Sequence, residues 1–198
     1  MKVQRNQRLE QGAVTRAALV AAARKLFAER GYHATGTEDV VGLASVTRGA
    51  LYYHFRDKEA LFEAVFRELA GELFAAASLE VMPLKDRWEQ MQTGLQVHLK
   101  LIAQSHEIQR VLLVDGPAVF GWAKWRELQS EFSLGALEVA ISDLIAAGVV
   151  QPHQPLVVAQ MVLSALNEAA LLIAHAPEPE AARLEIGETL AAMVSGLR

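Results

Sequence analysis

The stretch from Thr47 to Phe55 holds the side chains of this sequence that are best suited to binding chemistry. It has a helical pattern, and Thr47 at its start offers a hydroxyl and a backbone N–H that both bind phosphate. Arg48 can donate two hydrogen bonds to a guanine edge or pair with a phosphate. Leu51 and Phe55, four residues apart, are expected to point into a core. The pattern predicts a helix that reads DNA in the major groove.

Other residues of the same stretch fit this interpretation. Tyr52, Tyr53 and His54 each carry a polar tip on a rigid ring, although either tyrosine could instead pack against a preceding helix. Gly49 inside a helix costs about 1 kcal/mol relative to Ala, a cost that close approach of a sugar-phosphate chain would explain. Lys58, a cation in the first turn of the next helix, opposes the helix dipole and is placed for a second phosphate.

Three helices must position this stretch. The first is expected over about residues 15–30, with Thr15 as its N-cap and Gly31 just beyond its end. The segment Thr35-Gly36-Thr37-Glu38 matches a capping box and should start a second helix that ends near Ala44. The reading helix and a fourth helix capped by Asp57 follow. The second helix and the reading helix form a helix-turn-helix.

The rest of the chain is expected to be helical, so the predicted fold class is all-α. We predict an N-terminal three-helix DNA-binding domain at residues 1–60, of which residues 1–13 form a mobile arm, and a larger helical domain at residues 61–198. In the larger domain, Pro, Gly and Asp separate helices at about residues 84–104, 106–114, 117–132, 134–147, 155–175 and 178–197.

Charge is divided unevenly along the chain. Residues 1–60 carry ten Lys and Arg against six Asp and Glu, whereas residues 61–198 carry nine against 17. A basic N-terminal third on an acidic body is typical of a DNA-binding module fused to a domain that avoids DNA.

Composition excludes several classes of site. The 198 residues contain no cysteine, so disulfides and thiolate metal sites are absent. We find no metal-ligand spacing, no phosphate loop and no nucleophile motif, and we therefore predict no catalytic residues, metal or cofactor. No signal peptide is recognised, and the apolar tract at 156–174 is interrupted by Gln160, Asn167 and Glu168. A cytoplasmic protein is expected.

The N-terminal segment resembles the DNA-binding domain of the TetR family of bacterial transcriptional regulators. The resemblance covers about residues 15–62 and is carried in order and spacing by Leu26-Phe27, Gly31-Tyr32, Ala34-Thr35, Ala44, Val46, Gly49, Leu51-Tyr52, His54-Phe55, Lys58 and Leu61. One position departs from the pattern, because Ser45 stands where the turn usually has Gly. A non-Gly residue in a left-handed turn costs on the order of 1 kcal/mol.

The resemblance implies a set of DNA-facing positions, namely Thr37, Thr47, Arg48, Gly49, Tyr52, Tyr53, His54 and Lys58. It implies that Tyr52, His54 and Lys58 bind the phosphate backbone and that Arg48 and Tyr53 read bases. It also implies a C-terminal domain that binds a small molecule and forms a homodimer.

The residues support a dimer independently, because residues 155–175 are apolar nearly all round and must be covered on every face. Together with one apolar stripe in the last helix, and doubled by symmetry, they would form a four-helix interface. The alternative is a helix at the centre of a monomer core. The predicted interface residues are Val158, Met161, Val162, Leu166, Ile186, Leu190, Met193 and Val194.

A ligand pocket is predicted among aromatic and isolated polar residues of the larger domain: Trp88, Met91, His98, Phe120, Trp122, Trp125, Asn167 and Glu168. The same residues could be ordinary core or surface.

The preferred hypothesis is a dimeric repressor that binds a palindromic operator in double-stranded DNA and is released by a small, largely apolar or aromatic effector. An enzyme on a helical scaffold and a DNA-architectural protein without a ligand are the alternatives.

Overall fold

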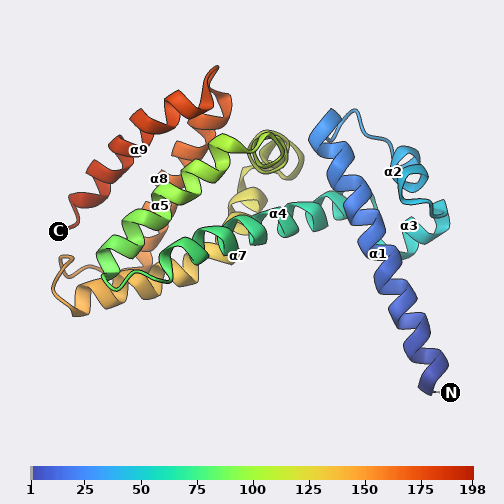
Figure 1. Cartoon of the computed structure of the whole chain (residues 1–198), viewed down its shortest axis with the longest axis horizontal. Coiled ribbons are helices and arrows are strands. Elements are labelled where there is room, and N and C mark those ends of the chain that lie inside the picture. The colour runs from blue at the N-terminus through green and yellow to red at the C-terminus, as the bar shows by residue number, and fades with distance from the viewer. Residues whose placement is uncertain (1) are drawn as a thin grey trace. The chain divides into compact units, whose positions relative to one another are not determined.

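The computed structural model describes the backbone of residues 2–198 and the side chains of residues 10–198. Within this range every regular element is a helix, as the sequence predicted (Figure 1). The chain divides into two compact units, residues 1–68 (unit 1) and residues 69–198 (unit 2). The division falls inside helix α4 (Lys58–Val81), at Glu68 rather than near the expected residue 60.

Unit 1 consists of α1 (Lys2–Arg30), α2 (Thr37–Ala44), α3 (Arg48–His54) and the first part of α4. Its core forms because each helix presents an apolar stripe inward. Phe27 of α1 meets Phe62 of α4 edge-on, with ring centroids 5.2 Å apart, and Leu19 and Leu51 are fully buried beside them.

The beginning of α1 differs from the expectation. The helix begins at Lys2 and not at Thr15, so residues 2–13, expected as an arm, continue it, while Met1 lies outside the described residues. The hydroxyl of Thr15 donates to the Gln11 carbonyl at 2.9 Å, a bond within the helix rather than a cap. Gly31 ends α1 with a φ of 80°, the left-handed conformation that glycine adopts without strain.

The connection to α2 also uses different groups from those expected. The N-cap is Gly36, whose backbone N–H donates to the Asp39 carboxylate at 3.0 Å. Thr35 is buried, and its hydroxyl donates to the Gly31 carbonyl at 2.8 Å. Thr35 therefore ties this connection to the end of α1 and does not cap α2.

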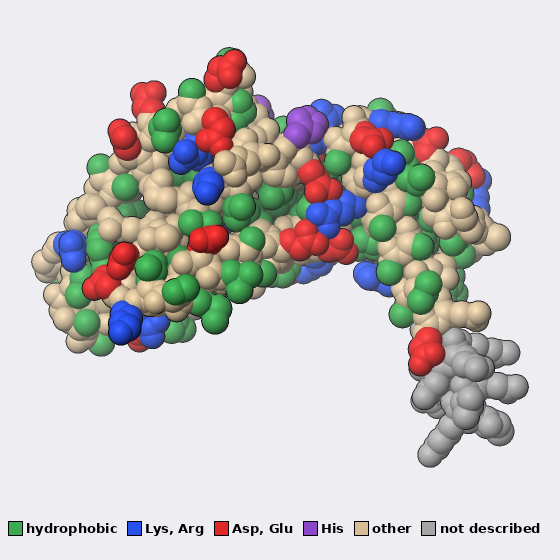
Figure 2. Space-filling view, in the orientation of Figure 1, with side chains coloured by type: hydrophobic (Ala, Val, Ile, Leu, Met, Phe, Trp, Pro, Cys, Tyr) green, Lys and Arg blue, Asp and Glu red, His purple; other side chains and the backbone are tan. Residues whose placement is uncertain are grey.

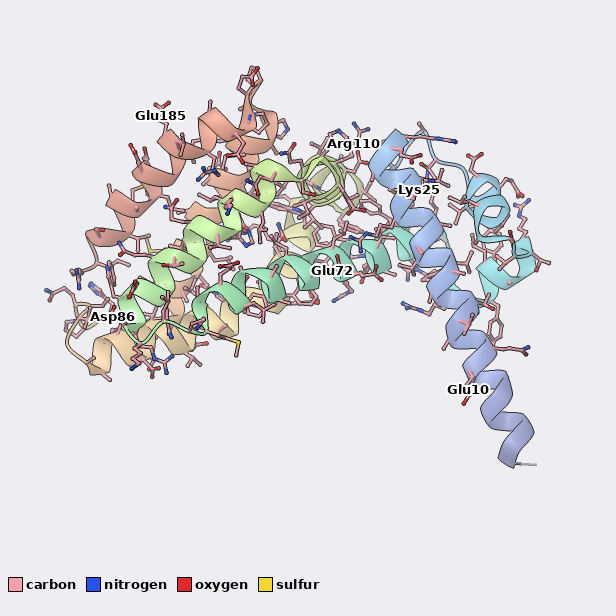
Figure 3. All side chains as sticks on the ribbon, viewed as in Figure 1. Glu10, Lys25, Glu72, Asp86, Arg110 and Glu185 are labelled. Carbon is pink, nitrogen blue, oxygen red and sulfur yellow. The ribbon has the colours of Figure 1, made fainter. Side chains whose placement is uncertain are left out.

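Unit 2 contains α5 (Arg87–Gln104), α6 (His106–Ile108), the π-helix η1 (Gln109–Asp115), α7 (Gly116–Ala146), α8 (Pro155–His175) and α9 (Pro179–Ser195), together with the end of α4. Asp86 caps α5 by accepting the Glu89 N–H at 2.7 Å (Figure 3). Helix α8 lies at the centre and packs against α5, α7, α9 and η1. By length and composition alone α8 is long and apolar enough to cross a membrane, and half of its most apolar window is buried in the unit.

The backbone between α5 and α8 departs from α-helical geometry at two places. Residues 109–115 form the π-helix η1, in which Arg110 Nε lies 3.3 Å from the carboxylate of the buried Asp115 (Figure 3). The indole N–H of the buried Trp125 donates to the Leu112 carbonyl at 2.7 Å. The two helices expected at 117–132 and 134–147 are one element, α7, whose break lies at Gly121 with a φ of 73°.

Candidate functional site

The turn before α3 is fixed by two local devices. Ser45 ends α2 in the left-handed conformation, with φ 54° and ψ 41°, and is the one non-glycine residue with a positive φ in the part of the chain that the structure describes. Thr47 caps α3 by accepting the Ala50 N–H on its hydroxyl at 3.2 Å. The irregular position that the sequence indicated is therefore a left-handed turn, and it sets the start of α3.

Helix α3 has one buried and one exposed face. Leu51 and Phe55 are buried, as their spacing predicted. Tyr53 is 83% exposed and Tyr52 43% exposed, while Thr47 lies with them on the exposed side. The exposed side carries hydroxyls and aromatic rings, which no helix covers among residues 10–68 of unit 1.

Gly49 leaves the backbone of α3 uncovered. A Cβ placed there would meet only the Thr47 hydroxyl, at 3.8 Å, so packing within the protein does not require glycine at this position. Glycine therefore leaves a smooth backbone surface at the exposed start of the helix.

Arg48 is paired with Glu38, which the sequence indicated only as part of a capping box. Its Nη1 atom lies 3.1 Å from Glu38 Oε1 of α2, and its guanidinium lies 5.6 Å from the centre of the Tyr52 ring. Both members of the ion pair are exposed, and exposed pairs contribute little to stability. The pair can therefore open at small cost, which leaves Arg48 available to another anion.

The other predicted DNA-facing residues surround α3. Thr37 lies half-exposed in the first turn of α2. Lys58 Nζ lies 4.1 Å above the Tyr32 ring, and desolvation of that phenol, followed by the charges of Glu59 and Asp57, raises the pKa of Tyr32. His54 is half-buried and lies against α1. Its Cε1 atom is so close to Gly12 that a Cβ added to that glycine would lie 3.8 Å from it.

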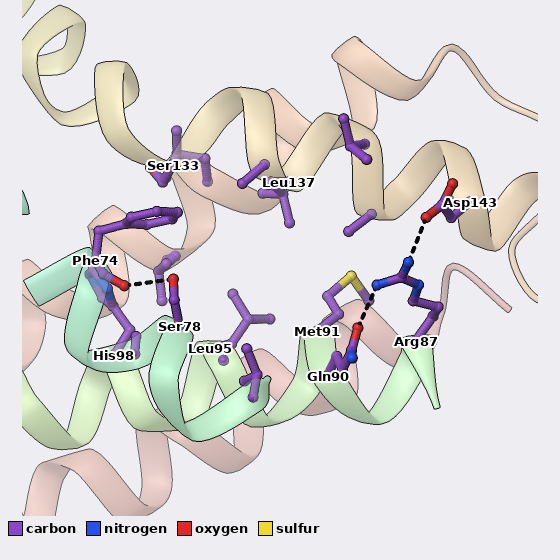
Figure 4. A pocket seen from close by; sticks show the side chains of 18 residues that line it. Phe74, Ser78, Arg87, Gln90, Met91, Leu95, His98, Ser133, Leu137 and Asp143 are labelled. Atoms are coloured by element: carbon purple, nitrogen blue, oxygen red, sulfur yellow. Dashed lines mark hydrogen bonds and ion pairs between the residues drawn. The ribbon is translucent and has the colours of Figure 1, made fainter. Parts of the chain in front are cut away.

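Unit 2 contains an apolar cavity of about 280 Å³ between the end of α4, α5, α7 and α8 (Figure 4). Of the predicted pocket residues, Met91 and His98 line it. Burial lowers the pKa of His98 from 6.5 to about 4, so the imidazole is neutral at physiological pH. Arg87 and Asp143, which line the cavity with them, are joined by an ion pair of 3.5 Å.

The aromatic residues expected in this pocket lie elsewhere. Trp88 and Trp125 are core side chains; the guanidinium of Arg198 covers the former, at 4.7 Å from its ring centre. Trp122 is 53% exposed, and Lys124 lies over the Phe120 ring. Asn167 lines a separate polar depression between α7 and α8, and Glu168 is exposed. An aromatic side chain fills a core as readily as it lines a pocket, so residue type alone could not distinguish the two.

The predicted dimer residues divide into two groups. Val158, Val162, Leu166, Leu190 and Val194 are buried within the single chain, because α8 packs against α9 in the same unit. Met161 is 69% exposed, Met193 is 63% exposed, and Ile186 is half-buried. Figure 2 shows hydrophobic side chains exposed among charged ones on the face of unit 2 in view.

Comparison with known proteins finds one family model within unit 1 and a second within unit 2. Residues 19–65 match the family model "Bacterial regulatory proteins, tetR family", and residues 88–197 match "Tetracyclin repressor-like, C-terminal domain". The crystal structure of a TetR-family transcriptional regulator from Pectobacterium atrosepticum is 34% identical, with a TM-score of 0.84, and the match covers 95% of this chain and 96% of that one.

Two curated relatives are also similar. The transposon Tn10 TetC protein of Escherichia coli is 28% identical over 145 residues, which are 71% of each chain. The probable acrEF/envCD operon repressor of Escherichia coli K12 is 36% identical over 96 residues, which are 46% of this chain and 43% of that protein. A helix-turn-helix module with an exposed polar α3, two matching family models and a full-length structural match make this chain a member of the TetR family of bacterial transcriptional regulators.

Proposed function

We propose that the protein is a homodimeric transcriptional repressor that binds a palindromic operator through α3 and leaves it when a small effector enters the unit 2 cavity. We place it in the cytoplasm, where the DNA is, and assign it a regulatory rather than a catalytic role. The observation that carries the proposal is the exposed polar face of α3, where Arg48 forms an exposed ion pair that opens at small cost.

The chemistry of unit 1 supports the proposed DNA contact. Arg48 and Tyr53 are assigned to base edges, and the exposed backbone at Gly49 allows a phosphate chain to approach closely. Thr37, Thr47, Tyr52, His54 and Lys58 supply hydroxyl, imidazole and ammonium groups around α3 for phosphate oxygens. The similarity to a probable operon repressor supports repression rather than activation.

Large exposed apolar side chains on α8 and α9 support the proposed dimer. Val157, Met161 and Leu172 of α8, and Leu184 and Met193 of α9, are large and exposed. Two copies that cover these side chains would present two α3 helices to successive major grooves, which repeat every ~34–36 Å along B-DNA. A change of a few ångströms between the two helices would prevent simultaneous docking.

Helix α4 offers a route by which an effector could act on α3. Phe74, Ala77 and Ser78 near its end line the cavity, whereas Leu61, Phe62 and Val65 near its start belong to the core of unit 1. An effector that binds one arrangement of α4 more tightly than another shifts the population toward that arrangement.

Binding to the intergenic DNA upstream of the gene tests the proposal, measured by fluorescence anisotropy at several salt concentrations. Affinity should fall as salt rises, and Arg48→Ala should weaken binding about tenfold or more, because one bidentate base contact is worth ~1–3 kcal/mol. Arg126→Ala, an exposed arginine in unit 2, is the matched control. Binding that is absent, or that Arg48→Ala leaves unchanged, contradicts the proposal.

A reporter gene behind the bound fragment separates repression from activation, because deletion of the regulator raises expression only if the protein represses.

The alternative function, a DNA-architectural protein with no effector, is disfavoured by the open apolar cavity in unit 2, since a purely structural domain has no use for unfilled volume.

A further inference from the structure

The unit 2 cavity is a slot that runs along α5. Its lining residues on that helix are Arg87, Gln90, Met91, Gly94, Leu95 and His98, which recur every three or four positions and so share one face. Arg87 and His98 are eleven residues apart, which corresponds to ~16 Å along a helix axis. Residues 133–143 of α7 line nearly the same length, and residues 74–81 of α4 line a shorter part of it (Figure 4).

Small side chains create the open volume. Ala77, Gly94 and Ala140 stand on three different helices that enclose the slot, and a Cβ at Gly94 would reach no closer than 3.6 Å to Val81. Phe74, Met91 and other apolar side chains form most of the remaining wall. A slot of this shape fits an extended hydrocarbon better than a broad ring system.

His98 provides the polar group at one end. Its ring has no hydrogen-bond partner among the residues that the structure describes. Every fully buried polar side-chain atom in the described part of the chain has a partner, so the nitrogens of His98 must remain accessible in the cavity wall. A neutral imidazole offers one donor and one acceptor, and a polar group left without a partner in an apolar wall indicates a missing ligand group.

The opposite end carries charges that already neutralise each other. Arg87 Nη2 lies 3.5 Å from Asp143 Oδ2, and Arg87 Nη1 donates to Gln90 Oε1 at 3.0 Å. Both charged side chains are exposed, so this end faces solvent. Among the lining residues Arg87 and Asp143 are the charged pair, and His98 is neutral, so an ionised ligand would enter without a counter-charge and lose its hydration.

We propose that the cavity binds an uncharged, elongated and mostly hydrocarbon molecule whose single hydroxyl or carbonyl group hydrogen-bonds to His98. The inference rests on the proposed function only in identifying that molecule with the effector. It narrows the expected, largely apolar or aromatic effector to a ligand class defined by the shape of the slot, its balanced charge and the unpartnered ring of His98.

Isothermal titration calorimetry on the full chain at pH 7.5 tests the inference with three probes of equal chain length: 1-octanol, octanoate and octylammonium. 1-Octanol should bind at least tenfold more tightly than either ion. His98→Leu should weaken 1-octanol binding about tenfold, the effect of losing one buried hydrogen bond. His98→Gln, which keeps a donor and an acceptor, should stay within about threefold of the original protein.

Two further variants control the experiment. His106→Leu makes the same substitution at an exposed histidine outside the cavity and should change nothing. Gly94→Leu fills the slot and should abolish binding, while its gain in helix propensity favours folding, which circular dichroism checks. Equal or tighter binding of octanoate or octylammonium, unchanged binding by His98→Leu, or no binding of 1-octanol to the folded protein would overturn the inference.

DNA binding is measured separately, so that the two proposals can fail independently. If 1-octanol binds with this dependence on His98 but leaves operator affinity unchanged, the ligand class stands and the effector-controlled release is wrong. If the protein does not bind DNA at all, the calorimetric results still decide the ligand class.

Discussion

Arg48 Nη1 lies 3.1 Å from Glu38 Oε1, so the first residue of α3 is paired with a carboxylate from α2 on the exposed side of unit 1. In the proposed complex, DNA phosphates and base edges compete with Glu38 for the guanidinium. The carboxylate also repels the DNA backbone, so it acts against binding in two ways.

Glu38→Gln should therefore strengthen DNA binding, by about two- to fivefold at low salt and less at high salt, because screening weakens both effects. Anisotropy with the upstream fragment measures the change. Thermal stability should stay within ~1 kcal/mol, since the pair is exposed. Glu185→Gln, on α9 of unit 2, removes the same charge elsewhere, and an equal gain there would contradict the specific role of Glu38.

Ser45 carries the left-handed turn between α2 and α3, with a φ of 54°. Ser45→Val should destabilise the protein by roughly 1–2 kcal/mol, because a β-branched side chain is strained in this conformation. Ser45→Gly should be neutral or stabilising by up to ~1 kcal/mol. Chemical denaturation of the two variants checks the order, and a valine variant as stable as the glycine variant would show that the turn does not hold this conformation.

Two glycines of α7 should respond in opposite ways to the same substitution, because a Cβ has open space at both but their backbones differ. Gly135 has helical geometry, so Gly135→Ala should stabilise by up to ~1 kcal/mol through helix propensity. Gly121 has a φ of 73°, so Gly121→Ala should destabilise by about 1–2 kcal/mol. Melting curves compare them directly, and equal signs would refute the break in α7.

His98 should make stability depend on pH. The pKa of His98 is about 4 in the folded chain, whereas the ordinary histidine pKa of 6.5 applies to the unfolded chain. Between pH 4 and pH 6.5 the unfolded chain therefore binds more protons than the folded chain. Stability is therefore full above pH 6.5 and falls as pH drops toward 4, by no more than about 3 kcal/mol from this group. Denaturation at pH 7.5 and pH 4.5 should show a smaller loss in His98→Leu than in the original protein; an equal loss would mean that His98 is not the group responsible.

Met161, exposed on α8, should lie in the proposed dimer interface. Met161→Glu should convert the dimer to a monomer in sedimentation velocity, because a charge buried between two copies has no partner. Operator affinity should fall with it. Leu79→Glu, at an equally exposed apolar residue of α4, is the control, and a dimer that survives Met161→Glu would place the interface elsewhere.

Unit 1 could be predicted closely because its signals are local. Gly31 ends α1, Thr47 caps α3, and Leu51 and Phe55 are buried as their spacing requires. The Arg48–Glu38 pair was missed because it joins two helices whose relative rotation depends on the turn at Ser45. The helical start of α1 was missed because its polar residues give no apolar period.

Unit 2 could be predicted only in outline. The all-α class and the central place of α8 follow from its apolar surface, but the position of the cavity does not. It arises where Ala77, Gly94 and Ala140, far apart in sequence, leave volume unfilled between three helices. The sequence predicted Trp88 and Trp125 as pocket residues, but both are buried in the core, because large rings are equally suited to close packing.

The bond from the indole of Trp125 to the Leu112 carbonyl gives the protein an internal optical probe. The buried Trp125 lies 4.9 Å from the exposed Trp122, ring centre to ring centre, so the two indoles sample an apolar and an aqueous environment side by side. Unwinding the π-helix η1 would break the bond and shift the emission of Trp125 toward that of a solvated indole. With Trp88 and Trp122 replaced by Phe, the fluorescence of Trp125 would therefore monitor the backbone of η1 without any attached label.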